Sequence, residues 1–147
     1  MDQIDIIILD ILQKEGRTKR NVLAEAVGLS LPSLSERLKK LEESKIIEGY
    51  YTKLNKKSFG YDLMVFITVI MQSSKNFSEL VKNVKATPEI LECHSVLGEG
   101  SHILKVLAKD TESLEKLLSK IQSWPGVERT VTSFVLSTIK ETTIIKI

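Results

Sequence analysis

Residues 28–43 read GLSLPSLSERLKKLEE. Leucines recur at positions 31, 34, 38 and 41, a spacing that predicts an amphipathic helix. Ser30 stands where an N-cap is expected, and Pro32 falls in the first turn, where its missing N–H costs nothing. Ser, Glu, Lys and Arg side chains occupy the other faces. The helix therefore either reads DNA, through hydrogen bonds to bases and ion pairs to phosphates, or is simply solvated.

The segment before this helix favours the DNA-reading alternative. Residues 2–14 carry isoleucines and a leucine at helical spacing with aspartates in the first turn, and Gly16 is placed to end that helix. Thr18 is expected to cap a second helix that Gly28 breaks. Only residues 28–30 then separate the second helix from the third, which is the spacing of a helix-turn-helix. The sequence therefore predicts that the third helix is a recognition helix.

Composition and charge are consistent with a DNA-binding protein of the cytoplasm. The chain has 147 residues, of which 42% are hydrophobic and 27% charged, as in soluble globular proteins. Its net charge is only +2, but residues 17–40 hold six basic and two acidic side chains. An acidic N-terminus and interrupted apolar runs predict neither export nor a membrane segment. The single cysteine, Cys93, excludes an internal disulfide framework.

The residues after the third helix predict a wing and a domain boundary. Ile46, Ile47 and the run 50–54 predict a short strand or wing, and the polar residues that follow predict a linker. The expected division is a DNA-binding domain at 1–55, a linker at 56–62 and a second domain at 63–147.

From Leu63 onward the apolar pattern changes from that of helices to that of alternating strands and helices. Strands are predicted at 63–71, 90–97, 102–109 and 127–139. Helices are predicted from Phe77 to before Pro88 and, capped by Thr111, from there to before Pro125. The order β-α-β-β-α-β is that of the ferredoxin-like fold, so the whole chain is assigned to the α+β class.

One face of such a sheet stays uncovered, because both helices of this fold lie on the other face. Residues 63–71 (LMVFITVIM) are apolar at almost every position, which predicts a strand that is apolar on both faces. A second copy of the sheet is the simplest cover for the exposed patch. We therefore expect a homodimer, which would also supply two helix-turn-helix units for a symmetric DNA site.

The sequence gives no support to metal binding or catalysis. Cys93 and His94 are adjacent on a predicted strand, so their side chains point to opposite faces and do not share a metal, and His102 lacks a ligand set. Nucleophile elbows, phosphate-binding loops and dinucleotide fingerprints do not occur, so neither an enzyme nor a cofactor is predicted. This disfavours a ferredoxin-like metabolic enzyme with an appended helical domain.

The chain resembles, over essentially its whole length, the Lrp/AsnC (leucine-responsive, feast/famine) family of prokaryotic transcription regulators. The segments that carry the resemblance are IDIIILDILQKEGR, AEAVGLS with SERLKKLEESKIIEGY, ECHSVLGEG and WPGVERTVT. The resemblance implies an N-terminal winged helix-turn-helix and a ferredoxin-like sensor (RAM) domain. It implies dimers that assemble into higher oligomers, often octamers, and regulation by a small effector, usually an amino acid. The expected localisation is cytoplasmic, in association with the nucleoid.

The resemblance also implies which residues meet DNA, because in this family the third helix reads the major groove of double-stranded DNA. The start of the second helix would meet the phosphate backbone. The residues of this chain assigned to DNA contact are Thr18, Lys19, Arg20, Ser30, Ser33, Ser35, Glu36, Arg37, Lys39 and Lys40.

The effector site implied by the resemblance is a loop between the middle strands, at an interface between dimers, where family members commonly have Gly-Asp-x-Asp. The residues of this chain there are Gly98, Glu99, Gly100, Ser101 and His102. Glu99 keeps the first acid, but Ser101 replaces the second, a carboxylate that would pair with the ammonium group of an amino acid. Further hydrogen bonds to a ligand are expected from Thr130, Thr132 and Ser133. One alternative is that Gly98 and Gly100 only make a hairpin turn. Another, favoured by the missing second acid, is an architectural DNA-wrapping protein that ignores small molecules.

Overall fold

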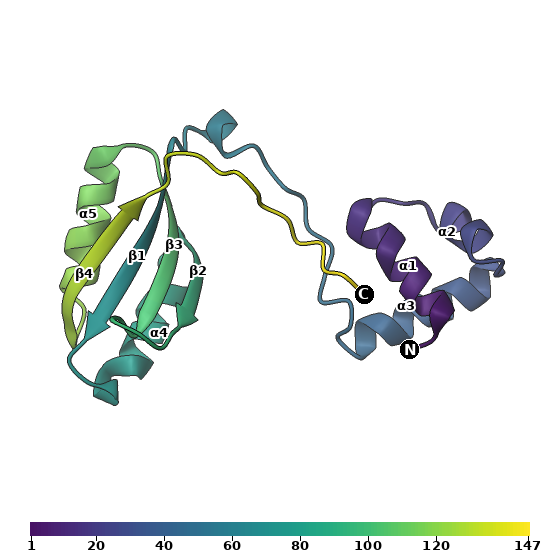
Figure 1. The fold of residues 1–147 in the computed structure, drawn as a ribbon, viewed down its shortest axis with the longest axis horizontal. Helices are drawn as coiled ribbons and strands as arrows, with labels where there is room; N and C mark the ends of the chain where they lie inside the picture. Colours follow the sequence, from purple (N-terminus) through teal and green to yellow (C-terminus); the bar gives the residue numbers. More distant parts are fainter. The chain divides into compact units, whose positions relative to one another are not determined.

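The computed structural model describes residues 1–147, which form two compact units (Figure 1). The helical unit comprises residues 1–53 and 140–147, and the sheet unit comprises residues 54–139. The expected division, with residues 140–147 in the second domain, stays a prediction. In the structure these residues group with the helical unit, where Glu141 bonds to Lys53 and Ile145 bonds to Gln13.

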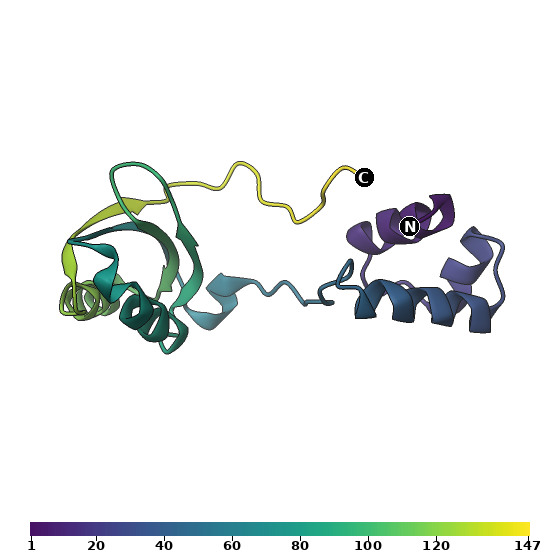
Figure 2. The ribbon, with the colours of Figure 1, turned by 90° about the horizontal axis from the view of Figure 1, so that it is seen from below.

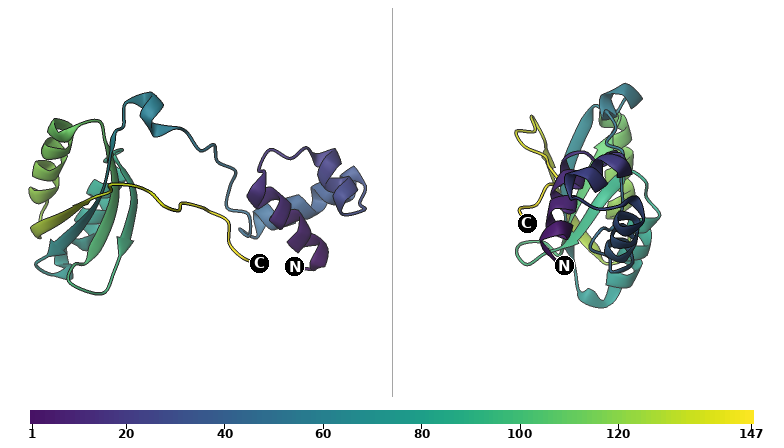
Figure 3. Two further views of the ribbon diagram at one scale, coloured as in Figure 1. Left: turned by 45° about the horizontal axis from the view of Figure 1, so that its top comes forward. Right: turned by 90° about the vertical axis from the view of Figure 1, so that its right-hand side faces the viewer.

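The helical unit is built from α1 (Gln3–Lys14), α2 (Arg20–Ala26) and α3 (Leu31–Glu43), which Figure 3 shows from two further directions. The predicted order of three helices is confirmed. Its small core lies where the apolar stripes of the three helices meet. The buried members of that core are Ile8, Leu23, Ala24, Leu34 and Leu38.

Of the three N-caps predicted from the sequence, the structure confirms one. The Ser30 hydroxyl caps α3 as predicted, accepting from the Ser33 N–H at 3.4 Å. Thr18 does not cap α2, because its hydroxyl instead donates to the Glu15 carbonyl at 2.7 Å. In the sheet unit the prediction of Thr111 as a cap is also wrong, since the Asp110 carboxylate accepts from the Ser113 N–H.

Two further details of the helical unit correct the sequence analysis. Leu31, on the predicted apolar stripe, is 50% exposed, because it begins α3 and lies beyond the core cluster. The predicted wing is not formed as a strand. Lys45 adopts a left-handed conformation with φ 60°, and the N–H groups of Ile46 and Ile47 both return to the Leu41 carbonyl. The chain therefore folds back on the end of α3, and Ile47 packs against the core.

The sheet unit has the predicted ferredoxin-like order. A short 3₁₀ helix (Lys56–Phe59) stands within the predicted linker, and the strands and helices that follow are β1 (Leu63–Met71), α4 (Phe77–Lys85), β2 (Ile90–Ser95), β3 (His102–Ala108), α5 (Thr111–Gln122) and β4 (Val127–Phe134). The strands are antiparallel in the order β2-β3-β1-β4. Both helices lie on one face of the sheet (Figure 2). None of the helices is long and apolar enough to cross a membrane.

The two faces of the sheet differ in what covers them. Val65, Ile67 and Val69 of β1 point toward α4 and α5 and are fully buried in the main core. The alternate residue Phe66 points to the open face and is 39% exposed. Val131 of β4, on the same open face, is 45% exposed. The prediction that β1 is apolar on both faces is confirmed, and the open face carries an apolar patch.

Candidate nucleic-acid interface and ligand pocket

Four exposed charged side chains of α3 pair with one another: Glu36 with Lys40 and Lys39 with Glu43. The Lys40 Nζ lies 2.8 Å from a Glu36 carboxylate oxygen, and this hydrogen bond lowers the pKa of Glu36. The Lys39 Nζ lies 3.7 Å from Glu43. Exposed pairs one helical turn apart stabilise a protein very little. A phosphate can therefore replace the carboxylate partner of either lysine at small cost.

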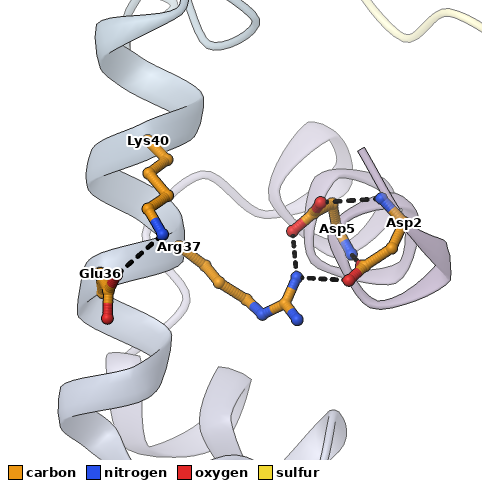
Figure 4. Close-up of polar contacts among 5 residues, drawn as sticks. All are labelled: Asp2, Asp5, Glu36, Arg37 and Lys40. Atoms are coloured by element: carbon orange, nitrogen blue, oxygen red, sulfur yellow. Dashed lines mark hydrogen bonds and ion pairs between the residues drawn. The ribbon is translucent and has the colours of Figure 1, made fainter.

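Arg37 is held differently from the lysines. Its guanidinium donates to Asp2 at 2.7 Å and to Asp5 at 2.8 Å, so it ties the start of α1 to the middle of α3 (Figure 4). The same two aspartates form the capping box of α1. Arg37 is predicted from the sequence to contact DNA, whereas in the structure its guanidinium binds two aspartates of the helical unit.

Replacing Arg37 with alanine is expected to lower the melting temperature of the helical unit and to weaken its sensitivity to acid. The Asp5 N–H and the Arg37 side chain hold the pKa of Asp2 below 3.8. Because the folded-state pKa is depressed, this stabilisation is present above pH 3.8 and is lost as the pH falls through the folded value. Thermal melts followed by circular dichroism between neutral pH and pH 2 should show a shallower loss in the variant. An unchanged melting temperature with weakened DNA binding would instead make Arg37 a DNA contact.

The start of α2 lies against α3. Lys19 and Arg20 are exposed, and the Arg20 guanidinium donates to the Ser35 hydroxyl at 3.3 Å. The Ser33 and Ser30 hydroxyls lie 2.9 Å apart, so both are engaged at the N-terminus of α3. The structure thus brings the backbone-contact candidates of α2 next to the base-contact candidates of α3. Lys19, Lys39 and Lys40 are the cations on this surface most available to an anion.

A pocket of about 330 Å³ opens on the uncovered face of the sheet, beneath the loop between β2 and β3. Figure 2 shows this loop arching over the face away from α4 and α5. The apolar walls of the pocket come from β1, β3, β4 and the loop. Its two ionisable residues are Glu99 and Arg129, which form no ion pair in the structure. The lining residues are Thr68, Ile70, Val96, Leu97, Gly98, Glu99, Gly100, Ile103, Arg129 and Val131.

Gly100 explains how the loop can lie so close to the sheet. A Cβ atom at this position would collide with the Thr68 side chain and approach the Val69 carbonyl oxygen at 3.1 Å. The Ser101 N–H donates to that same carbonyl at 3.0 Å. The loop is therefore fastened to β1 immediately after the pocket, and only a glycine fits where it crosses.

The residues assigned to effector binding do not all reach the pocket. Ser101 and His102 are outside it: the Ser101 hydroxyl donates to the Val69 carbonyl at 3.3 Å and lies 2.8 Å from the His102 Nδ1. His102 is buried edge-on against Phe77, and burial lowers its pKa, so the imidazole is neutral near pH 7. These two side chains anchor the loop.

The three hydroxyl residues of β4 are divided between the two faces. Thr130 and Thr132 point toward the helices, and the Thr130 hydroxyl accepts from the Gln122 amide at 3.0 Å. Ser133 lies on the open face opposite Phe66, outside the pocket. Sequence reasoning missed Arg129, which sits opposite Ile70 on that face. The alternation of Arg129 with Val131 in the sequence indicates that both side chains lie on the same face of the strand. Only the antiparallel register of β4 with β1 shows that this position lies beside the β2–β3 loop.

The structure contains no cluster of three or more His, Cys, Asp or Glu side chains that could hold a metal ion. Cys93 packs against the main core, and burial raises the pKa of its thiol. His94 is exposed and lies 3.2 Å from Glu92. The prediction that the two side chains point to opposite faces is confirmed.

Two family models match the chain. Residues 1–48 match a winged helix-turn-helix DNA-binding domain, and residues 63–145 match the Lrp/AsnC ligand binding domain. The transcriptional regulator FL11 from Pyrococcus horikoshii is 36% identical over 143 residues, covering 97% of this chain and 94% of the relative. The leucine-responsive regulatory protein of Haemophilus influenzae is 35% identical over 145 residues, covering 97% and 87%.

Solved structures agree with these matches along the whole chain. A transcriptional regulator from Neisseria meningitidis in complex with L-methionine superimposes with a TM-score of 0.92 at 34% identity, covering 99% of this chain and 96% of that one. AsnC from E. coli gives 0.90 at 29% identity, covering 98% and 97%. The feast or famine regulatory protein from M. tuberculosis, complexed with L-methionine, gives 0.90 at 28% identity with the same coverage.

Proposed function

The chain belongs to the Lrp/AsnC family of DNA-binding transcription regulators, not to an enzyme family, and we propose that its effector is an amino acid with an apolar side chain. The observation that carries this proposal is the pair Glu99 and Arg129, two unpaired opposite charges in one apolar pocket. Glu99 would accept hydrogen bonds from the ammonium group, and Arg129 would donate to the carboxylate. Ile70, Ile103 and Val131 would contact the side chain.

Two further observations support an amino acid in this pocket. Its volume of about 330 Å³ is at the small end of the range for ligand sites, which suits a small ligand. The similar regulators from Neisseria meningitidis and M. tuberculosis are complexed with L-methionine. The second carboxylate, which Ser101 replaces in this chain, is thus not required. Glu99 and Arg129 together match the two charges of an amino-acid zwitterion.

For DNA, we propose that a homodimer presents two copies of α3 to adjacent major grooves. Lys39 and Lys40 on α3, with Lys19 and Arg20 at the start of α2, would meet phosphates, and the exposed side chains of Ser33 and Glu36 would face base edges. The homodimer would form through the open face of the sheet. Because Thr68, Ile70 and Val131 belong both to that face and to the pocket, ligand binding would alter the association of copies and so the spacing of the two recognition helices.

The experiment that tests this function is selection of binding sequences from random duplex DNA, followed by footprinting with and without each amino acid. We expect a defined, roughly two-fold symmetric site whose affinity changes with an apolar amino acid such as L-methionine. If no sequence is protected at any salt concentration, the DNA-reading surface is wrong. If a site is protected but no amino acid alters it, the effector assignment fails and the architectural role takes its place.

Replacing Arg129 with glutamine is expected to weaken amino-acid binding about 10- to 100-fold, because a hydrogen bond to a charged group contributes about 1.5–3 kcal/mol. Isothermal titration calorimetry with the amino acid found above measures the change. Glu128→Gln is the matched control, since Glu128 is charged and exposed on the same strand but does not line the pocket. Equal affinity in the wild type and Arg129→Gln would remove Arg129 from the site.

A further inference from the structure

The C-terminal segment, residues 140–147, belongs to the helical unit that residues 1–53 form. The chain leaves the helical unit after Lys53, builds the whole sheet unit, and re-enters the helical unit at Lys140. Two covalent connections therefore join the two units, one on each side of the sheet unit in sequence. Residues 140–147 contain no helix or strand, yet several specific bonds hold them.

Gln13, near the end of α1, bonds to both backbone polar groups of Ile145. Its Oε1 accepts from the Ile145 N–H at 2.7 Å, and its Nε2 donates to the Ile145 carbonyl at 3.1 Å. A side-chain amide thereby supplies the paired donor and acceptor that a neighbouring strand residue would supply in a sheet.

Two other bonds order the same segment. The Lys53 Nζ lies 2.9 Å from a Glu141 carboxylate oxygen, an exposed ion pair that places the start of the tail beside Lys53, the last residue before the sheet unit. The Thr142 hydroxyl accepts from the Ile144 N–H at 3.1 Å and sets a local turn. The tail is thus held at its start and near its end.

Burial distinguishes the tail from the residues that lead to it. Leu136 and Ile139 are 97% and 93% exposed. Ile144, Ile145 and Ile147 are 46%, 66% and 47% exposed, so each is partly covered. Apolar burial of this kind favours docking. The change in exposure coincides with the boundary at residue 140 between the two compact units.

We propose that residues 140–147 are a strap that docks on α1 through Gln13 and transmits the state of the sheet unit to the recognition helix. The route runs along α1: Gln13 near one end holds the tail, and Asp2 and Asp5 at the other end hold Arg37 of α3. A shift in the sheet unit that pulls on the strap therefore acts on the helix against which α3 is fixed. The signalling role rests on the proposed effector function, but the docking does not.

Docking is tested by amide hydrogen exchange of Ile145 in the full-length protein, measured by NMR. We expect the Ile145 N–H to exchange slowly in the wild type and roughly tenfold faster or more in Gln13→Ala, which removes both bonds. Gln13→Glu keeps an acceptor and should retain part of the protection. Gln3→Ala, an exposed glutamine on the same helix, is the matched control and should leave the rate unchanged. Exchange of Ile145 in the wild type as fast as in an unstructured peptide overturns the proposal.

Transmission is tested with a chain ending at Ile139 and, in parallel, with full-length Gln13→Ala. We expect both variants to bind DNA with wild-type affinity but to lose most of the effect of the amino acid on that affinity. Full retention of the effect in both variants overturns the strap as transmitter. A wild type that binds DNA but responds to no amino acid contradicts the proposed effector instead, and the Ile145 exchange rate still decides whether the tail docks.

Discussion

Leu34→Ala is expected to abolish DNA binding by unfolding the helical unit while the sheet unit stays folded. Leu34 is fully buried in the small core that α1, α2 and α3 share. Deleting its side chain leaves a cavity, and such changes typically cost about 2–5 kcal/mol. A core of this size rarely supplies more than about 3–5 kcal/mol in all. The loss is therefore comparable to the whole stability of the unit.

The measurement combines two readouts on the same variant. Fluorescence anisotropy with the selected DNA site should show at least a tenfold loss of affinity, since each 1.4 kcal/mol is about tenfold. Far-ultraviolet circular dichroism should show loss of helix with the sheet signal retained. Leu31→Ala is the control, because Leu31 lies one turn earlier on the same helix and is 50% exposed. If Leu34→Ala also melts the sheet unit, the two units do not fold independently.

Phe66→Glu is expected to convert the proposed homodimer into a monomer. Phe66 lies at the centre of the open face and is 39% exposed in the single chain. In a dimer through this face the new carboxylate would be buried without a partner from the other copy, a cost of several kcal/mol. In the monomer the same side chain stays in water on the uncovered face, so the sheet itself should remain folded.

Sedimentation velocity at micromolar concentration distinguishes the two states. Val81→Glu provides a matched control, because Val81 is 42% exposed but lies on α4, on the other side of the sheet. We expect Val81→Glu to sediment with the wild type and Phe66→Glu to sediment as a single chain. A dimer that survives Phe66→Glu would place the interface elsewhere, and the link between the pocket and the interface would be lost with it.

Patterns local in sequence predicted the elements well. The run LMVFITVIM formed β1 with both faces apolar, and the leucine spacing of α3 buried Leu34, Leu38 and Leu41. Local sequence patterns did not predict contacts between residues that are far apart in the chain. The partners of Arg37 lie 32 and 35 residues away on another helix, so nothing in the pattern around Arg37 indicated that its charge was already used.

The pocket beneath the β2–β3 loop likewise depends on contacts between residues distant in sequence. Glu99 was identifiable from its loop, but Arg129 joins it only because β4 runs antiparallel to β1 with Arg129 opposite Ile70. The wrong prediction of a helix cap at Thr18 has a local cause, a competing hydrogen bond. Thr18 had the right chemistry for a cap, but the nearer Glu15 carbonyl took its hydroxyl.

The inward-facing Cys93 gives the chain a built-in chemical reporter. It is the single thiol of the sequence, it lies on the edge strand β2, and burial raises its pKa, so little thiolate is present at neutral pH. Because Cys93 is partly buried, alkylating reagents should modify it faster when β2 separates from the core. The rate of modification therefore measures the opening of the sheet unit alone, whatever happens to the three helices at the other end of the chain.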